Sequence, residues 1–237
     1  MMIVGDTHDL PSHSQERFEW ALEVADHYLD KGDWIVQVGD FGDWVSFSSF
    51  DKGTKGHVEE NYEADFVSAD AAWRKFYNPR YRYCVVEGNH EYRIQKAIKE
   101  DYRLDGLLSM NRLPWRRNHR VVQAPYGQKV CINGVHFVHH LTSRTGRAVS
   151  GSAQSQFRKF RGSLVVGHSH VWDWFEEAID HDNRQFCMIA GHLSHPDHAK
   201  EEWCRATSHD WWSGVTLLFD VKDGFPHGGI VREPYRP

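Results

Sequence analysis

The sequence predicts a layered α/β sandwich in which helices cover the faces of mixed β-sheets. In the first half of the chain, short apolar runs alternate with segments whose apolar residues recur at helical spacing. The second half contains short apolar runs separated by turn residues, which is typical of a β-rich region. There is no internal repeat and no linker rich in Pro, Gly or Ser, so we expect a single domain over residues 1–237.

The first half predicts strands and helices in strict alternation. Apolar runs indicate the strands and periodic apolar residues the helices. Ser14 would cap the first helix and Gly32 would end it. In chain order we expect a strand at 2–5, a helix at 14–30, a strand at 34–38, a helix at 59–77, a strand at 82–86 and a helix at 93–110.

The second half predicts mostly strands. Asn133-Gly134 is a strong hairpin signal between two of them, and an Asp223-Gly224 turn follows the last. We expect one helix at 152–160 and strands at 120–124, 129–132, 135–139, 164–166, 186–190 and 215–221.

Composition excludes several classes of protein. The 237 residues are 40% apolar and 26% charged, which predicts a buried core. The net charge of −5 with neutral His disfavours a protein that coats DNA through positive charge. No apolar run approaches the ~18 residues of a membrane span, and residues 1–10 do not have the pattern of a signal peptide. The four Cys are far apart, so we expect reduced, mostly buried thiols in a cytoplasmic protein.

Clusters rich in Asp, Asn and His directly follow five of the predicted strands. Ligand sites of open α/β sheets form outside the carboxyl ends of strands, so converging strands would bring these clusters together. The clusters are Gly5-Asp6-Thr7-His8-Asp9, Gly39-Asp40-Phe41-Gly42-Asp43, Gly88-Asn89-His90-Glu91, His139-His140 and Gly167-His168-Ser169-His170.

The residue types in these clusters favour a metal site. In an extended segment, residues two apart point the same way, so Asp6 with His8, and His168 with His170, can act as ligand pairs. A carboxylate such as Asp40 can bridge two cations. Mixed carboxylate and imidazole ligands suit Mn, Fe or Zn better than Ca. Two such cations about 3.5–4 Å apart can clamp a phosphoryl group.

Taken in order, the five clusters resemble the motifs of the calcineurin-like metallophosphoesterase superfamily. Its pattern is D-x-H, G-D-x-x-D, G-N-H-[DE], an isolated His and G-H-x-H, and the resemblance spans about residues 2–170. It implies the metallophosphoesterase fold, an αββα-type sandwich with the active site at the carboxyl ends of the strands. The remainder, through Trp212-x-Gly214, is similar to small phage and bacterial members. A phage-encoded chain would work in the host cytoplasm.

The resemblance implies two divalent metal ions per chain, with Mn²⁺ favoured and Fe or Zn as alternatives. The first metal would be held by Asp6, His8, Asp40 and His170. Asp40 would bridge to the second metal, completed by Asn89, His139 and His168. His140 would point to the opposite side of an extended strand from His139, and we favour His139 because residues 135–138 lead into it as a strand.

The resemblance also implies catalytic and substrate-binding residues. His90 would lie beside the substrate phosphate, with Asn89 as a further contact, and would donate a proton to the leaving oxygen or stabilise the transition state. Asp43 and Glu91 would orient His90 or the His ligands. Independently of the resemblance, Arg144 and Arg147 lie between the last two clusters. Their guanidinium groups would grip phosphate oxygens, or equally well form a solvated surface.

Other His, Trp and Arg residues receive less specific roles. His192, His195 and His198 are expected to be polar loop residues near the cleft rather than ligands, and the basic run at 158–161 is expected to be a solvated helix face. Five Trp residues can stack on bases, but we favour a core role for Trp172, Trp174, Trp203, Trp211 and Trp212. We expect surface positions for His13, His27, His57, His181, His209 and His227.

These residues predict an enzyme that hydrolyses phosphomonoester or small phosphodiester bonds of a phosphorylated small molecule or a nucleic-acid end. A metal-activated hydroxide would attack and His90 would assist the leaving group. We expect no membrane and no obligate protein partner. The alternatives are a DNA or RNA nuclease of a replication or repair system, which the basic run at 112–120 favours, and a non-catalytic metal-stabilised binding protein.

Protein phosphatase activity is disfavoured by two positions. Protein Ser/Thr phosphatases of this superfamily usually have Arg after the second motif and before the third. Trp44 and Glu87 stand at those positions in this chain.

Overall fold

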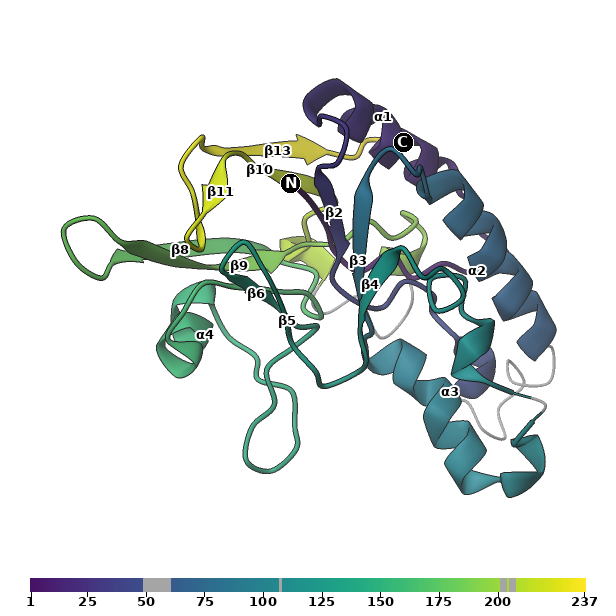
Figure 1. Cartoon of the computed structure of the whole chain (residues 1–237). Coiled ribbons are helices and arrows are strands. Elements are labelled where there is room, and N and C mark those ends of the chain that lie inside the picture. Colours follow the sequence, from purple (N-terminus) through teal and green to yellow (C-terminus); the bar gives the residue numbers. More distant parts are fainter. Residues whose placement is uncertain (49–60, 107, 201–203, 205–207) are drawn as a thin grey trace.

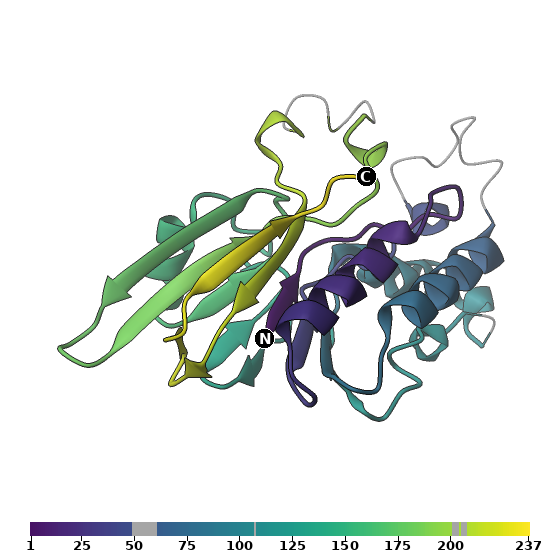
Figure 2. The same ribbon diagram turned by 90° about the horizontal axis from the view of Figure 1, so that it is seen from above.

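Two β-sheets face each other, and helices cover their outer faces (Figures 1 and 2). The computed structural model describes residues 1–48, 61–106, 108–200, 204 and 208–237. One sheet has six strands in the order β13 (Ile230–Pro234), β10 (Gly214–Leu218), β1 (Met2–Val4), β2 (Trp34–Gln37), β3 (Arg82–Val86) and β4 (Val121–Ala124). The other has five strands in the order β5 (Val130–Ile132), β6 (Val135–Phe137), β7 (Leu164–Val166), β9 (Arg184–Ala190) and β8 (Trp172–Ala178).

The helices form the two outer layers. On the six-stranded sheet, α1 (Glu16–Tyr28) and α2 (Tyr62–Phe76) lie side by side, and α3 (Asn89–Glu100) follows β3 (Figure 1). On the five-stranded sheet lies α4 (Ala153–Phe160). The small hairpin of β11 (Val221–Lys222) and β12 (Phe225–Pro226) stands apart from both sheets. Short 3₁₀ turns connect these elements at Val45–Phe47 (η1), Tyr102–Leu104 (η3), Met110–Arg112 (η4), His198–Lys200 (η5) and Ser208–Asp210 (η6).

Strand directions bring the carboxyl ends of several strands to one region. Strands β1 to β4 pair parallel, and β6, β7 and β9 pair parallel in the other sheet. The remaining pairs are antiparallel, so both sheets are mixed. The predicted mixed-sheet sandwich, with helices on the sheet faces, is therefore confirmed.

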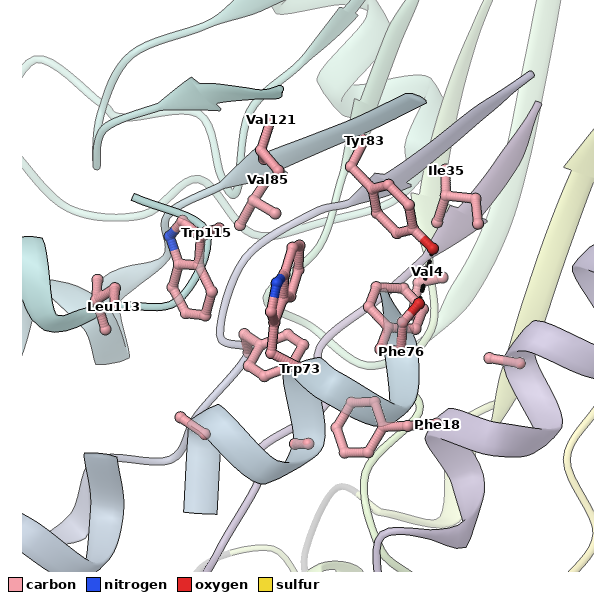
Figure 3. Close-up of a cluster of buried hydrophobic side chains, with 14 of the residues drawn as sticks. Val4, Phe18, Ile35, Trp73, Phe76, Tyr83, Val85, Leu113, Trp115 and Val121 are labelled. Atoms are coloured by element: carbon pink, nitrogen blue, oxygen red, sulfur yellow. Dashed lines mark hydrogen bonds between the residues drawn. The ribbon is translucent and has the colours of Figure 1, made fainter. Parts of the chain in front are cut away.

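The core consists of three apolar layers that follow the alternation of side chains along the strands. In β3, Tyr83 and Val85 pack toward the helices, whereas Cys84 and Val86 pack between the two sheets. A third cluster lies between the five-stranded sheet and α4. Figure 3 shows the helix-side layer, where the Tyr83 hydroxyl donates to the Phe76 carbonyl oxygen at 2.7 Å. Fully burying one such aromatic side chain contributes about 2–3 kcal/mol.

Most predicted elements are present, with two differences in the first half. The helix predicted at 93–110 begins at Asn89, where Gly88 serves as its N-cap, and ends at Glu100. The N-cap of α1 is Gln15 rather than the predicted Ser14, whose hydroxyl accepts from the Glu16 amide at 3.4 Å. The start predicted for the second helix, at residues 59–60, lies outside the described residues.

Three strands in the second half were not predicted. Strand β8 is an edge strand without a buried residue, and its acidic residues give little apolar signal. Strands β12 and β13 are the other missed strands. The predicted hairpin at Asn133-Gly134 is confirmed, and both residues have positive φ.

The core role expected for the Trp-rich region holds in part for Trp174, which is partly buried, packs against the core between the sheets and stacks on Phe186. Trp172, Trp211 and Trp212 are also only partly buried and belong to no core cluster, and Trp203 lies outside the described residues. The Trp residues of the core are instead Trp44, Trp73 and Trp115. None of the four Cys, all of which the structure describes, forms a disulfide, and three of them are buried. Among the described residues, no helix has the length and apolar character that a membrane crossing requires.

Candidate functional site

The loops after β1, β2, β6 and β7 are joined by backbone hydrogen bonds at one edge of the sandwich. After β1 and β2, the amides of Thr7 and His8 both donate to the carbonyl oxygen of Asp40, each at 3.0 Å. After β6 and β7, the Gly167 amide donates to the His139 carbonyl oxygen at 2.9 Å. The two sheets are linked because the His168 amide donates to the Asp6 carboxylate, at 2.9 Å to Oδ2. The clusters found in the sequence therefore form one site.

A first group of potential metal ligands surrounds His8. The groups Asp6, His8 and Asp40, and His8, His170 and His198, each place their ligand atoms within 4.8 Å of one another. His170 Nε2 lies 3.2 Å from Asp6 Oδ2 and 3.0 Å from His8 Nε2. Adjacent ligands of a cation with bonds near 2.1 Å are separated by about 3 Å, so this spacing fits a metal ion.

A second group shares Asp40 with the first. Asp40, His139 and His168 form a further cluster of potential ligands. His139 Nε2 lies 3.1 Å from Asp40 Oδ2 and 3.0 Å from Asn89 Oδ1. His139 Nδ1 donates to the Val38 carbonyl oxygen at 2.9 Å, so Nε2 is the nitrogen that would lose its proton and offer a lone pair to a cation. Three electron-rich atoms that converge in this way fit a cation.

His140 has other partners. Its Nε2 lies 3.0 Å from the Tyr126 hydroxyl, and its Nδ1 lies 3.1 Å from the Leu141 carbonyl oxygen. The structure thus places His139 with the second group and turns His140 toward Tyr126.

The protonation states suit cation binding. Burial and the neighbouring His198 and His90 lower the pKa of His8 to about 3. Burial, again with His198, lowers the pKa of His170 to about 3. Both rings are therefore neutral at pH 7, the form that binds metals. Burial opposes a charge on His139, but Asp40 and Asp6 outweigh it and raise its pKa to about 10. Without a cation, this imidazolium supplies the balancing positive charge.

His90 is held by Asp43 beside the shared carboxylate. Its Nδ1 lies 2.8 Å from both the carbonyl oxygen and Oδ1 of Asp43, so Nδ1 carries a proton. Its Nε2 lies 3.8 Å from Asp40 Oδ2. Burial opposes a charge on His90, but Asp40 and Asp43 raise its pKa. This geometry leaves Nε2 as the ring atom that faces the two ligand groups.

Glu91 stabilises the loop that carries Asp40 rather than holding His90. Its Oε2 accepts from the amides of Asp40 at 3.0 Å and Gly88 at 2.8 Å. Its Oε1 accepts from the Gly42 amide at 3.2 Å and the Trp44 indole at 3.0 Å. These four donors are its hydrogen-bond partners among the described residues. Glu91 therefore affects the site by fixing the backbone that carries Asp40.

Close backbone approach also requires glycine beside Asp40. A Cβ atom on Gly88 would lie 2.1 Å from Asp40 Oδ1, which accepts from the His90 amide at 2.9 Å. Four expected ligands have left-handed backbones, with φ of 42° at His8, 50° at Asp40, 74° at His168 and 60° at His170. Such conformations cost about 1–3 kcal/mol each and are typical of functional sites.

Sequence reasoning missed three residues at this site. His198, expected to be a polar loop residue, is fully buried in η5 and stacks on His8 with ring centroids 4.4 Å apart. His192 is also buried, with its ring 5.4 Å from that of His170. The spacing of three residues from His192 through His195 to His198 was visible in the sequence, but the burial of His192 and His198 was not. The third residue is Arg93, which contacts His90 and Asp43. Its position three residues after His90 could have predicted this contact, because residues three apart lie on the same helix face.

The other expected surface and substrate residues lie elsewhere. Arg144 and Arg147 are exposed in the loop between β6 and α4, and their side chains make no hydrogen bond to the site among the described residues. Their substrate role stays a prediction. His13 is partly buried and stacks on His195 at 4.4 Å, while His57 lies outside the described residues.

The basic run at 112–120 is largely neutralised by ion pairs. Arg112 pairs with Glu63 at 2.6 Å, and Arg117 pairs with Asp70. Arg116 forms a bidentate pair with the buried Glu87, at 2.5 and 2.6 Å. These pairs reduce the positive charge that the run can offer to a nucleic acid.

Comparisons with known proteins agree with this geometry. The family model of calcineurin-like phosphoesterases matches residues 1–224, a span that includes all five clusters. A search of curated proteins found no match to the chain.

Proposed function

The chain belongs to the calcineurin-like phosphoesterase family, and from that premise we propose that it hydrolyses phosphomonoesters or small phosphodiesters with two divalent cations, Mn²⁺ being favoured. One observation carries the proposal. The free carboxylate oxygen of Asp40, Oδ2, lies within 4.0 Å of three imidazole nitrogens, those of His8, His90 and His139. The Asp40 carboxylate thus belongs to both groups of potential ligands, as a bridging ligand must. It also lies next to His90, the residue that we place beside the substrate.

The ligand assignment follows from these contacts. The first cation would be held by Asp6, His8, Asp40 and His170, and the second by Asp40, Asn89, His139 and His168. Bound there, divalent cations supply Lewis acidity toward the phosphoryl oxygens and lower the pKa of water.

The protein's own contribution is to orient His90 and stabilise charge. Asp43 fixes the His90 ring through Nδ1, so that Nε2 can hold a proton beside the leaving-group oxygen. Asp40 and Asp43 raise the pKa of His90 against the effects of burial and Arg93, which favours a proton on Nε2 when Arg93 does not donate to it. Asn89 and His90 stand in the first turn of α3, where the helix N-terminus also attracts the phosphoryl group.

Small substrates are favoured over nucleic-acid strands. The arginines that suggested a nuclease are engaged with Glu63, Asp70 and Glu87. Glu87 also stands where protein phosphatases usually have arginine, and here its carboxylate is committed to Arg116. The substrate we propose is therefore a phosphorylated small molecule or a terminal phosphate.

The test is turnover of para-nitrophenyl phosphate and bis-para-nitrophenyl phosphate by chelator-stripped protein with added Mn²⁺. Asp40→Asn is expected to lose both metal and turnover. His90→Ala is expected to keep the metal and lose most turnover, because neither proposed ligand set includes its side chain. The control is His181→Ala, whose side chain is 100% exposed. Turnover that survives chelation, or Asp40→Asn with wild-type activity, would contradict the proposal.

A further inference from the structure

An arginine from α3 reaches into the site that the family motifs define. Arg93 Nη1 donates to the carbonyl oxygen of Asp43 at 2.9 Å and lies 3.3 Å from its Oδ1. Arg93 Nη2 lies 3.0 Å from His90 Nε2. The side chain is 22% exposed, so solvent reaches part of it. Arg93 thus contacts both His90, which we place beside the leaving-group oxygen, and Asp43, which orients His90.

The contact with His90 shows where an incoming ligand would meet Arg93. Guanidinium groups donate hydrogen bonds and never accept them, so His90 Nε2 is the acceptor in this arrangement. Nε2 also faces Asp40 Oδ2 at 3.8 Å. His90 Nε2 therefore contacts both the Arg93 guanidinium and the Asp40 carboxylate, which the two ligand groups share.

The hydrogen bonds of Arg93 leave part of its guanidinium available to an anion. Asp43 holds one edge of the guanidinium through Nη1, and among the described residues Nε makes no hydrogen bond. A guanidinium fixed on one side and open on another is suited to bind a phosphoryl oxygen, because its N–H groups diverge in a planar fork.

We propose that Arg93 binds the third non-bridging phosphoryl oxygen, which a phosphomonoester has and a phosphodiester lacks. This inference rests on the proposed function. Two non-bridging oxygens would be taken by the two cations, and in a diester the third position carries an ester group that offers no comparable charge. Arg93 would turn from His90 Nε2 to this oxygen while Nη1 remains on Asp43. The site would then prefer monoesters and terminal phosphates.

The main experiment compares the two chromogenic substrates in Arg93→Gln and Arg93→Lys. Loss of a charge-assisted hydrogen bond predicts a fall of roughly 10- to 100-fold in kcat/KM for the monoester in Arg93→Gln. The fall for the diester should be less than about threefold, since that substrate makes no such bond. Arg93→Lys, which keeps the charge without the fork, is expected between wild type and Arg93→Gln. Arg103→Gln is the matched control, because Arg103 is 76% exposed and pairs with Asp101.

A binding measurement separates this inference from the proposed function. Calorimetry on Mn²⁺-loaded protein would compare inorganic phosphate, which has the third oxygen, with dimethyl phosphate, which has not. Arg93→Gln should weaken phosphate binding about tenfold or more and leave dimethyl phosphate binding and metal content unchanged. If wild type turns over neither substrate, the proposed function fails, and the phosphate measurement still decides the role of Arg93.

Two results would overturn the inference. Equal losses for the monoester and the diester would make Arg93 a positioning residue for Asp43 and His90. Phosphate affinity that is the same in wild type and Arg93→Gln, or absent in both, would mean that Arg93 does not bind a phosphoryl oxygen.

Discussion

Replacing Glu91 with glutamine tests how the Asp40 loop is held in place. The carboxylate accepts four N–H donors, from Asp40, Gly42, Gly88 and the Trp44 indole. Glutamine keeps one carbonyl oxygen and points an NH₂ group at two of these donors. Glu91→Gln therefore loses two hydrogen bonds to a charged acceptor and leaves buried donors without partners.

The expected loss of stability follows from those contacts. Hydrogen bonds to charged groups contribute about 1.5–3 kcal/mol each, so losing two costs about 3–6 kcal/mol. This is a large share of the roughly 5–15 kcal/mol that stabilises a typical domain. At about 2–4 °C per kcal/mol for a chain of this size, Tm should fall by roughly 10 °C.

The assay is urea unfolding of metal-free protein at pH 8.5. Burial and the nearby Asp40 raise the pKa of Glu91 to about 7, so at this pH the carboxylate is ionised. The control is Glu63→Gln, an exposed carboxylate paired only with Arg112, which is expected to cost less than about 1 kcal/mol. A loss below 1 kcal/mol in Glu91→Gln would refute the argument that this side chain holds the loop.

Three further predictions address the metal ligands and one ion pair. His139→Ala is expected to lose one metal equivalent by elemental analysis, whereas His140→Ala keeps both, and equal metal content in the two variants would contradict the assignment. Because its raised pKa of about 10 keeps His139 protonated at pH 8, metal binding should release about one proton, measurable by calorimetry in buffers of different ionisation enthalpy. Release of none would show that the His139 ring is already neutral. Arg116→Ala leaves the buried Glu87 unpaired and should cost about 3 kcal/mol in urea unfolding; restoration of stability by adding Glu87→Gln would identify the unpaired charge as the cause.

Local patterns were enough to predict most of the fold. Apolar runs located β1, β2, β3 and β7, because a strand buried on both faces is a nearly continuous apolar run. The same reasoning missed β8, because an exposed edge strand carries charged residues. It also placed the third helix too late, since the motif residues that begin α3 were interpreted as loop.

By itself, the sequence predicted the Asp, Asn and His residues of the five clusters as a common site, because their place after strand ends follows from local order along the chain. The family match over residues 1–224 supports the resemblance on which their roles rest. Only the tertiary structure decided how those residues meet. It turned His139 toward Asp40 and His140 toward Tyr126, buried His198 against His8, and brought Arg93 onto His90. Such contacts depend on side-chain direction and on packing between distant segments, and neither is written in the spacing of residues along one chain.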